Sequence, residues 1–254
     1  MGVARRTVFV MSAVLAGFIA PASAAEIRVL TGNAVGASQQ ALAAEFTKKT
    51  GHEVKFLSTN PAIIQQKIDA NEPFELYVIP AAFLRAAEKA GKVKPGASRP
   101  VAKVGVGVAA RADGPKLDFS TPDAFKKMLA DARKVAFSDA ATGGLSALSV
   151  ARVLETLGVA EMVKAKAVTQ GNGQEMVGKG EVDFGLYNVS EIPRAPNVVL
   201  AGRLPASIQA YLEYDAAIPA GAAAPEPALA FLAFITAPEA RAKWEASGID
   251  MAGT

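Results

Sequence analysis

Cysteine is absent from the 254 residues of this chain, and histidine occurs once, as His52. Without cysteine there can be no disulfide and no thiolate metal site, so stability must come from packing. With one histidine, a zinc site would need an improbable set of carboxylates. The chain also lacks a Gly-x-Ser-x-Gly motif, which argues against a serine hydrolase triad. We expect no metal and no cofactor, and we interpret His52 as a solvated residue in a turn.

An excess of positive charge is missing as well. The chain has 27 Lys and Arg residues against 24 Asp and Glu residues. Arg5 and Arg6 lie in the first 24 residues, so the remainder is close to neutral. Nucleic-acid-binding proteins usually carry a basic stripe, and this sequence has none. We therefore expect no nucleic-acid partner.

The N-terminal segment has the three parts of a secretory signal. Arg5 and Arg6 precede an apolar run at 8–20, and Ala22-Ser23-Ala24 closes it with small residues. The run is too short to span a bilayer, and the pattern is typical of a cleavable signal peptide. An uncleaved anchor is the alternative. We expect residues 1–24 to be removed on the general secretion route and the mature chain to be periplasmic.

Apolar runs and helical patterns alternate along the rest of the chain, as in α/β proteins. The opening series contains two crossovers, which predict a parallel sheet. The pattern restarts near residue 101 and predicts a second α/β lobe. Beyond Tyr187 the chain is rich in proline, and we expect the two helices that follow to pack back on an existing lobe. The expected strands are 27–30, 54–57, 76–79, 101–110, 135–137 and 182–186, and the expected helices are 38–49, 61–68, 83–89, 122–129, 145–157, 228–235 and 239–246.

Three loops each follow a predicted strand and open a predicted helix: 31–38, 58–60 and 138–144. They are rich in hydroxyls, amides and glycine, and the stretches 29–44 and 140–151 contain no charged residue. Helix N-termini present unpaired N–H groups and a partial positive charge, so such loops at one sheet edge form an anion site. The loops predict an anion held by neutral donors. The alternative is that their Thr, Asn and Ser residues only cap helices.

Other features can contribute to the same site. Gly143-Gly144 and Gly171-Asn172-Gly173 let the backbone approach a ligand closely, although plain turns explain them equally well. Tyr187 follows the predicted strand 182–186, where its hydroxyl can reach a crevice. Packing at a boundary is the alternative for this tyrosine.

Five stretches carry a family resemblance: 31–37, 49–54, 56–68, 74–79 and 180–187. Together they resemble the periplasmic substrate-binding proteins of ABC importers, within the group similar to molybdate-binding proteins. The resemblance covers nearly the whole mature chain. It implies an α/β, two-lobed periplasmic-binding-protein-like fold of type II, with a ligand cleft between the lobes that closes by hinge motion.

The resemblance also implies roles for single residues. In molybdate-binding proteins, serine hydroxyls of the first two loops, backbone N–H groups of later loops and a tyrosine hydroxyl surround a dehydrated oxyanion. At the matching positions of this chain, these roles go to Thr31 or Asn33, to Ser58 and Thr59, to the backbone of Thr142, Gly143, Gly144 and Asn172, and to the hydroxyl of Tyr187.

Two loops depart from the family pattern. The first offers Thr31-Gly32-Asn33 where the family has a serine, and the third lacks the usual proline. Asn33 and Asn172 supply both donors and acceptors, which suits an organic carboxylate or a partly protonated anion better than a tetrahedral dianion. Some members of this group resemble aconitate isomerase, an exported enzyme on the same scaffold.

These observations predict an exported solute-binding protein that captures a small oxyanion or organic carboxylate for an ABC permease in the inner membrane. We expect a monomer with lobe 1 at 25–103, lobe 2 at 104–204, and a C-terminal segment at 205–254 that returns mainly to lobe 1. Two alternatives stay open: a periplasmic isomerase of a small tricarboxylate, and a sensor that passes its bound state to a membrane partner. The isomerase needs a base within reach of a carbon-bound hydrogen, for which the candidates are Asp139, Tyr187 and Glu213.

Overall fold

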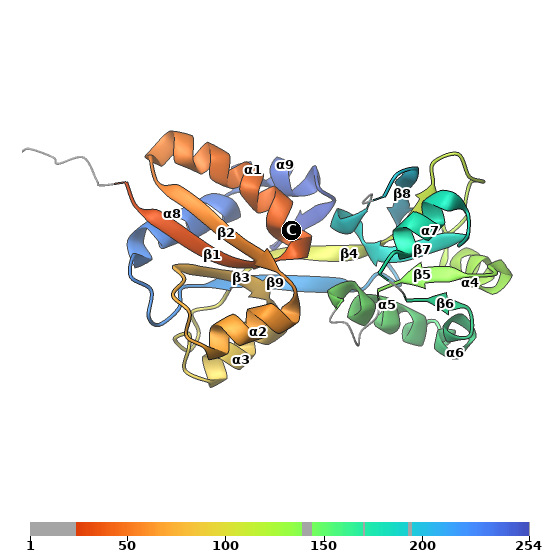
Figure 1. The fold of residues 1–254 in the computed structure, drawn as a ribbon, viewed down its shortest axis with the longest axis horizontal. Helices are drawn as coiled ribbons and strands as arrows, with labels where there is room; N and C mark the ends of the chain where they lie inside the picture. The colour runs from red at the N-terminus through yellow and green to blue at the C-terminus, as the bar shows by residue number, and fades with distance from the viewer. Residues whose placement is uncertain (1–23, 139–143, 170, 193–194, 254) are drawn as a thin grey trace, which may run out of the picture.

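The structure is a computed structural model that describes residues 24–138, 144–169, 171–192 and 195–253. The predicted signal peptide lies outside these residues apart from Ala24. Within the described part, no helix is long and apolar enough to cross a membrane. Figure 1 shows two α/β lobes arranged along the long axis of the molecule.

Lobe 1 is built on the parallel strands β1, β2 and β3, with β9 antiparallel to β3. All five side chains of β3 are buried, the continuous apolar pattern of a parallel strand covered on both faces. Helix α1 lies on one face of this sheet, and α2 and α3 lie on the other (Figure 1). The bounds are β1 Glu26–Gly32, α1 Asn33–Thr50, β2 Glu53–Thr59, α2 Pro61–Asp69, β3 Leu76–Pro80, α3 Ala81–Lys89 and β9 Tyr211–Ala217.

Lobe 2 repeats this plan with β5, β6 and β7 parallel to one another. Its core is a separate cluster that includes the fully buried Phe125, Leu129 and Val150. Thr121 caps α4 by accepting a hydrogen bond from the N–H of Ala124 at 3.1 Å. The bounds are α4 Pro122–Asp131, β5 Val135–Phe137, α5 Leu145–Thr156, α6 Ala160–Lys164, β6 Ala167–Val168, α7 Gly173–Lys179, β7 Phe184–Asn188, the 3-10 turn η2 Val189–Glu191 and β8 Val198–Arg203.

The long strand β4 (Arg99–Arg111) belongs to both lobes. Up to Gly105 it pairs with β9 and with β10 (Ile249–Met251), and from Val106 onward it pairs with β7 and β8. Both β4 and β9 run between the lobes in Figure 1. The point where β4 changes partners is therefore the structural junction of the molecule.

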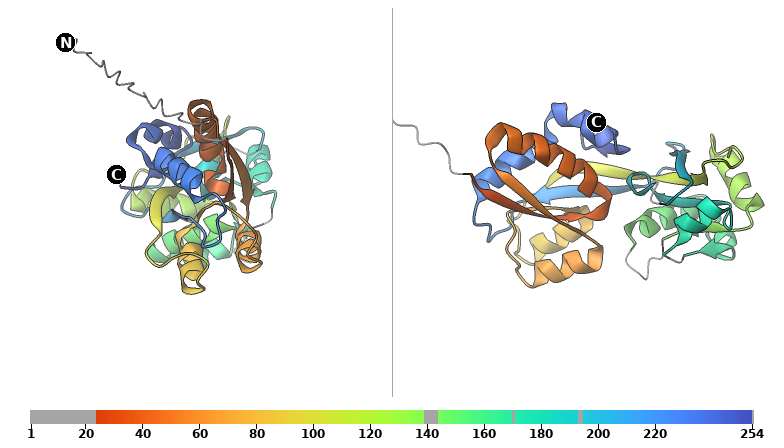
Figure 2. Two further views of the ribbon diagram at one scale, coloured as in Figure 1. Left: turned by 90° about the vertical axis from the view of Figure 1, so that its left-hand side faces the viewer. Right: turned by 45° about the horizontal axis from the view of Figure 1, so that its top comes forward.

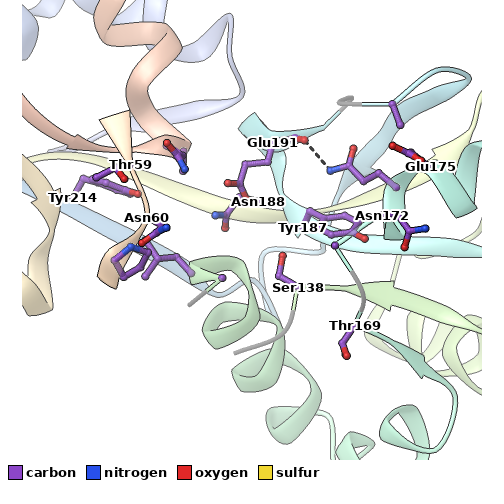
Figure 3. Close-up of a pocket in the computed structure, with 18 residues that line it drawn as sticks. Thr59, Asn60, Ser138, Thr169, Asn172, Glu175, Tyr187, Asn188, Glu191 and Tyr214 are labelled. Atoms are coloured by element: carbon purple, nitrogen blue, oxygen red, sulfur yellow. Dashed lines mark hydrogen bonds between the residues drawn. The ribbon is translucent and has the colours of Figure 1, made fainter. Parts of the chain in front are cut away.

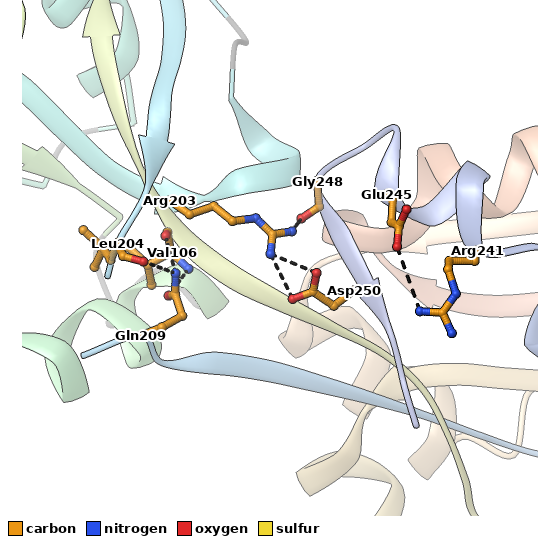
Figure 4. Close-up of polar contacts among 8 residues, drawn as sticks. All are labelled: Val106, Arg203, Leu204, Gln209, Arg241, Glu245, Gly248 and Asp250. Atoms are coloured by element: carbon orange, nitrogen blue, oxygen red, sulfur yellow. Dashed lines mark hydrogen bonds and ion pairs between the residues drawn. The ribbon is translucent and has the colours of Figure 1, made fainter. Parts of the chain in front are cut away.

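A glutamine braces this junction (Figure 4). The side-chain oxygen of Gln209 accepts from the N–H of Val106 at 2.7 Å, and its amide nitrogen donates to the Val106 carbonyl at 3.0 Å. A Cβ on Gly105 would lie only 3.0 Å from this amide. A second link joins the lobes nearby, where Arg203 of β8 donates to both carboxylate oxygens of Asp250 at 2.9 Å.

The C-terminal helices pack beside α1 on lobe 1 (Figure 2). Phe231 of α8 (Pro225–Thr236) is fully buried, and its ring meets that of Phe46 edge-on at 5.1 Å between centroids. Trp244 of α9 (Arg241–Glu245) is also fully buried, and its indole N–H donates to the carbonyl of Ile235 at 2.9 Å. Between these helices lies the 3-10 turn η3, Pro238–Ala240.

The start of α1 differs from the prediction. We expected a polar loop at 31–38, but Thr31 and Gly32 end β1 and the helix begins at Asn33. Ala34 and Val35 face the core, so burial extends the helix five residues earlier than its sequence pattern indicates. Several elements were not predicted, namely α6, β6, α7, η2, β8, β9 and β10. The division points at 103/104 and 204/205 stay a prediction, because β4 belongs to both lobes.

Candidate functional site

A pocket of about 330 Å³ lies between the lobes (Figure 3). Its wall on lobe 1 is formed where two strands end and two helices begin. Asn33 and Ala34 open α1, Thr59 ends β2, and Asn60 and Pro61 open α2. Parallel strands place these junctions at one sheet edge, which is where open α/β sheets bind ligands.

Two asparagines on this wall have fixed orientations. The side-chain oxygen of Asn60 accepts from the N–H of Ile63 at 3.1 Å and so caps α2. The hydroxyl of Ser58 donates to the side-chain oxygen of Asn33 at 3.2 Å. This bond occupies the acceptor of Asn33 and leaves its NH₂ group as a donor at the start of α1.

The wall on lobe 2 has the same construction. Ser138 follows β5, Gly144 and Leu145 open α5, and Thr169 and Asn172 lie between β6 and α7. The hydroxyl of Ser146 donates to that of Ser138 at 2.8 Å, so the Ser138 proton is available to another acceptor. Neither α1 nor α5 has a side-chain cap on its first turn. Among the described residues, no side-chain cap therefore occupies their leading backbone N–H groups, and that of Ala34 acts on the hydroxyl of Tyr214.

The floor of the pocket comes from β7, η2 and β9. It contains Tyr187, Asn188, Glu191 and Tyr214, and Asn188 lies between the two walls in Figure 3. Asn188 is fully buried, and neither atom of its amide has a hydrogen-bond partner among the described residues. Buried amides in native proteins are almost always paired, so this one calls for an explanation.

Tyr214 reaches the floor because Gly32 has no side chain. A Cβ at Gly32 would lie 2.5 Å from the phenolic oxygen. This hydroxyl is buried, and no described residue lies in good hydrogen-bonding geometry to it. Burial raises the pKa of Tyr214 far above its usual value and the negative charge of Glu191 adds to the rise, whereas the backbone N–H of Ala34 opposes it. The Tyr214 hydroxyl is therefore a neutral donor at physiological pH.

Tyr187 behaves in the same way. Burial raises the pKa of its hydroxyl to about 12, and the residue is 7% exposed. Its oxygen would lie 2.5 Å from a Cβ at Gly173, which places the hydroxyl against the start of α7. Such a group donates a hydrogen bond at neutral pH and is a poor general base.

The charge of the pocket comes from helix ends and two carboxylates. Helices α1, α2 and α5 each place a partial positive charge of about half a unit at the pocket, with no acidic residue in the first turn. Glu175 and Glu191 also line the pocket, whereas no Lys, Arg or His does among the described lining residues. Binding by neutral donors agrees with the sequence pattern, but the two glutamates were not expected.

Five of the nine residues predicted from the sequence line this pocket: Asn33, Thr59, Gly144, Asn172 and Tyr187. Thr142 and Gly143 lie outside the described residues. The remaining two, Thr31 and Ser58, do not line it.

Thr31 and Ser58 have other roles. The hydroxyl of Thr31 is fully buried, donates to the carbonyl of Val78 at 2.9 Å and accepts from the amide of Gln39 at 2.8 Å. It joins β1 to β3 and α1, and its expected role as a ligand donor stays a prediction. Ser58 lies behind Asn33 and orients that amide.

Sequence reasoning found Tyr187 but missed the other three residues of the floor. Asn188, Glu191 and Tyr214 were not named, although the alternation of Leu212, Tyr214 and Ala216 is the period-two signal of a strand. The prolines on either side of this segment are atypical of a central strand. Asn188 carried no signal beyond following Tyr187.

The other chemically interesting residues lie elsewhere. Glu213 is exposed and does not line the pocket, and Asp139 lies outside the described residues. His52 is half-buried, stacks on Phe46 at 6.1 Å between centroids, and accepts from the N–H of Ala25 at 3.1 Å. Among the described residues, no three His, Asp or Glu side chains gather where they could hold a metal ion.

Comparison with known proteins identifies the family. The model of the bacterial extracellular solute-binding protein family matches residues 27–250. The chain belongs to this family. An aconitate isomerase from a Pseudomonas species is 26% identical over 229 residues, which cover 88% of this chain and 87% of that protein.

Solved structures share the fold at low identity. The molybdate-binding protein of Azotobacter vinelandii has a TM-score of 0.69 at 22% identity, covering 88% of this chain and 98% of that one. A substrate-binding domain assigned to a molybdenum ABC transporter of Clostridium difficile has a TM-score of 0.75 at 14% identity, covering 89% and 99%. The expected two-lobed periplasmic-binding-protein fold is confirmed. The matching family is described as extracellular, and the Azotobacter protein as periplasmic.

Proposed function

We propose that this solute-binding protein captures a small organic carboxylate between its lobes in the periplasm. The observation that carries the proposal is the convergence of α1, α2 and α5 on one pocket that has no cationic side chain among its described lining residues. Neutral N–H donors at helix ends bind an anion without a counter-charge. Asn33, Thr59, Ser138 and Tyr187 add side-chain donors around them.

The size of the pocket favours an organic anion over a tetrahedral oxyanion. Its volume of about 330 Å³ corresponds to roughly ten water molecules in the liquid. A tetrahedral oxyanion would leave much of this space to water. Glu175 would also repel a compact dianion, whereas a longer ligand can direct its carboxylates toward the helix ends.

We further propose that the monomeric loaded protein delivers its ligand to an ABC permease in the inner membrane. The likeness in fold to binding proteins for molybdate supports this role. Binding is reversible and needs no covalent step. Hinge motion about β4 and β9 would close the lobes over the ligand.

Thermal unfolding and isothermal titration of the mature chain test the binding role. The panel contains molybdate, tungstate, sulfate, and di- and tricarboxylates. A true ligand raises the melting temperature by mass action, with about 2.7 kcal/mol of added stability at 100 times Kd. The proposal would be overturned if no carboxylate in the panel raised the melting temperature and gave a binding isotherm.

A second candidate function is isomerisation of a small tricarboxylate. The relative that is an aconitate isomerase favours it, and so do the two carboxylates that line the pocket. Glu191 would be the base, since Tyr187 is protonated at neutral pH. Incubation with cis-aconitate and detection of the trans isomer separates the two functions: turnover that is lost in Glu191→Gln would establish the enzyme, and absence of turnover would exclude this reaction.

A further inference from the structure

We propose that Asn188, Glu191 and Tyr214 form a subsite for a hydroxyl group, which makes the protein selective for hydroxycarboxylates. We call these three residues the floor subsite. The inference rests on the proposed function, because it specifies which carboxylates the pocket prefers.

The state of Asn188 is the first argument. Its amide is fully buried on the pocket floor, and both the nitrogen and the oxygen lack partners among the described residues. A buried unpaired amide destabilises a protein, so such a group is retained where another molecule satisfies it. The amide offers two donors and an acceptor, and a purely anionic ligand would leave the acceptor unpaired.

The surroundings of Asn188 give the second argument. Tyr214 contributes a buried phenolic hydroxyl that also lacks a full hydrogen bond to the described residues. Glu191 lines the same floor, and its charge acts on the Tyr214 hydroxyl. An anionic ligand group has no proton to donate to the side-chain oxygen of Asn188, so a ligand atom that satisfies this oxygen must carry a proton.

A hydroxyl group fits this combination better than the alternatives. It can donate to Glu191 and at the same time accept from the amide of Asn188 or the hydroxyl of Tyr214. A carboxylate cannot donate to the side-chain oxygen of Asn188, and an ammonium group cannot accept from Asn188 or from Tyr214. The helix ends on the two walls remain free for the carboxylates of the same ligand.

Matched ligand pairs test the selectivity. Citrate and tricarballylate differ by one hydroxyl, as do malate and succinate, and aspartate replaces the malate hydroxyl with an ammonium. We expect titration calorimetry to show at least one hydroxyl member of a pair binding about 10-fold to 100-fold more tightly than its partner. Equal affinities within both pairs, or tighter binding of aspartate than of malate, would overturn the floor subsite while leaving carboxylate binding intact. Absence of binding by every carboxylate would overturn the proposed function as well.

Variants locate the selectivity. Asn188→Leu and Tyr214→Phe should each reduce the affinity ratio within the selective pair by about 10-fold. The melting temperature of the free protein should change little, because Asn188 has no hydrogen-bond partner among the described residues and Tyr214 has only a weak contact with the N–H of Ala34. Tyr77→Phe is the matched control, since Tyr77 is buried in lobe 1 and does not line the pocket. If Asn188→Leu does not fold, Tyr214→Phe alone decides. An unchanged ratio in every folded variant of the floor would refute the subsite.

Discussion

Replacing Gly173 with alanine should push the hydroxyl of Tyr187 out of its position. The new Cβ would lie 2.5 Å from that oxygen and 3.1 Å from the Cβ of Ala136. The ring has little room to move away, because it already packs against Gly185. A Cβ built on Gly185 would lie 2.4 Å from the Cε2 atom of Tyr187. Overpacking of this kind costs about 1–3 kcal/mol. The backbone of Gly173 is not left-handed, so the cost comes from the contact and not from strain.

The same substitution should be harmless when Tyr187 is phenylalanine. Without the hydroxyl, the nearest ring atom is 3.8 Å from the new Cβ, and only the tight contact to Ala136 remains. Alanine at this compatible site can then add about 0.4–1 kcal/mol by restricting the unfolded chain. Urea unfolding of the four proteins in the cycle, followed by circular dichroism, should give a coupling energy of about 1.4–4 kcal/mol, the difference between these two effects. Additivity within about 0.5 kcal/mol would show that the hydroxyl does not lie against Gly173.

Ligand affinity provides a second reading of the cycle. A hydroxyl that donates to a buried anion contributes about 1.5–3 kcal/mol, so Tyr187→Phe should weaken carboxylate binding by that amount. Gly173→Ala should also weaken binding although the hydroxyl is still present, because it is displaced. The double variant should bind no worse than Tyr187→Phe. If Tyr187→Phe binds the carboxylate as tightly as the unmodified protein, the tyrosine has only a packing role.

Thr31→Val should lower the free energy of unfolding by about 1–3 kcal/mol and leave affinity unchanged, whereas Thr59→Ala should weaken ligand binding by about 1–3 kcal/mol; urea unfolding and calorimetry on both variants would contradict us if the two effects were exchanged. Burial raises the pKa of Asp183, but hydrogen bonds from Arg133 and from neighbouring backbone N–H groups outweigh it and leave the pKa below its usual value. The stability that this carboxylate contributes is present above about pH 4 and is lost as the pH falls through the lowered pKa. In Asp183→Asn, the melting temperature should therefore depend less on pH in this acid range. The same pH dependence as in the unmodified protein would refute the assignment. Trp244→Ala should destabilise the protein by about 3–5 kcal/mol in chemical unfolding, since the side chain is fully buried between α9 and α1, and a loss under 1 kcal/mol would show that the C-terminal helices are not part of the core.

The walls of the pocket could be predicted from the sequence because local signals mark them. Asn60-Pro61 is a helix start in any context, since the side chain caps the turn and proline suits the first helical position. The uncharged stretch around Asn33 likewise indicated a helix end open to an anion. Thr31 was predicted on the same grounds but does not line the pocket, because its side chain turns inward and bonds its neighbours.

Asn188 and Tyr214 could not be predicted because their place on the floor depends on long-range pairing. Tyr214 reaches the pocket only because β9 returns between β3 and β4, and no local pattern specifies that return. Asn188 looks like an ordinary loop residue beside Tyr187 in the sequence. Its burial follows from the register of β7 on β4, where it pairs with Val106.

That register connects ligand recognition to the junction of the lobes. Val106 is the first residue of β4 that pairs with β7, and Gln209 holds both its N–H and its carbonyl. Asn188 is therefore tied to the part of the molecule that a rotation about β4 and β9 would displace least. The walls belong to separate lobes, so the same rotation would change the distance between α1 and α5 much more than the distance of either from the floor. In the proposed function, the floor would contact the ligand before the lobes close, and the helix ends would bind it after closure. Substitutions in the floor should therefore change selectivity, and substitutions in the walls should change affinity.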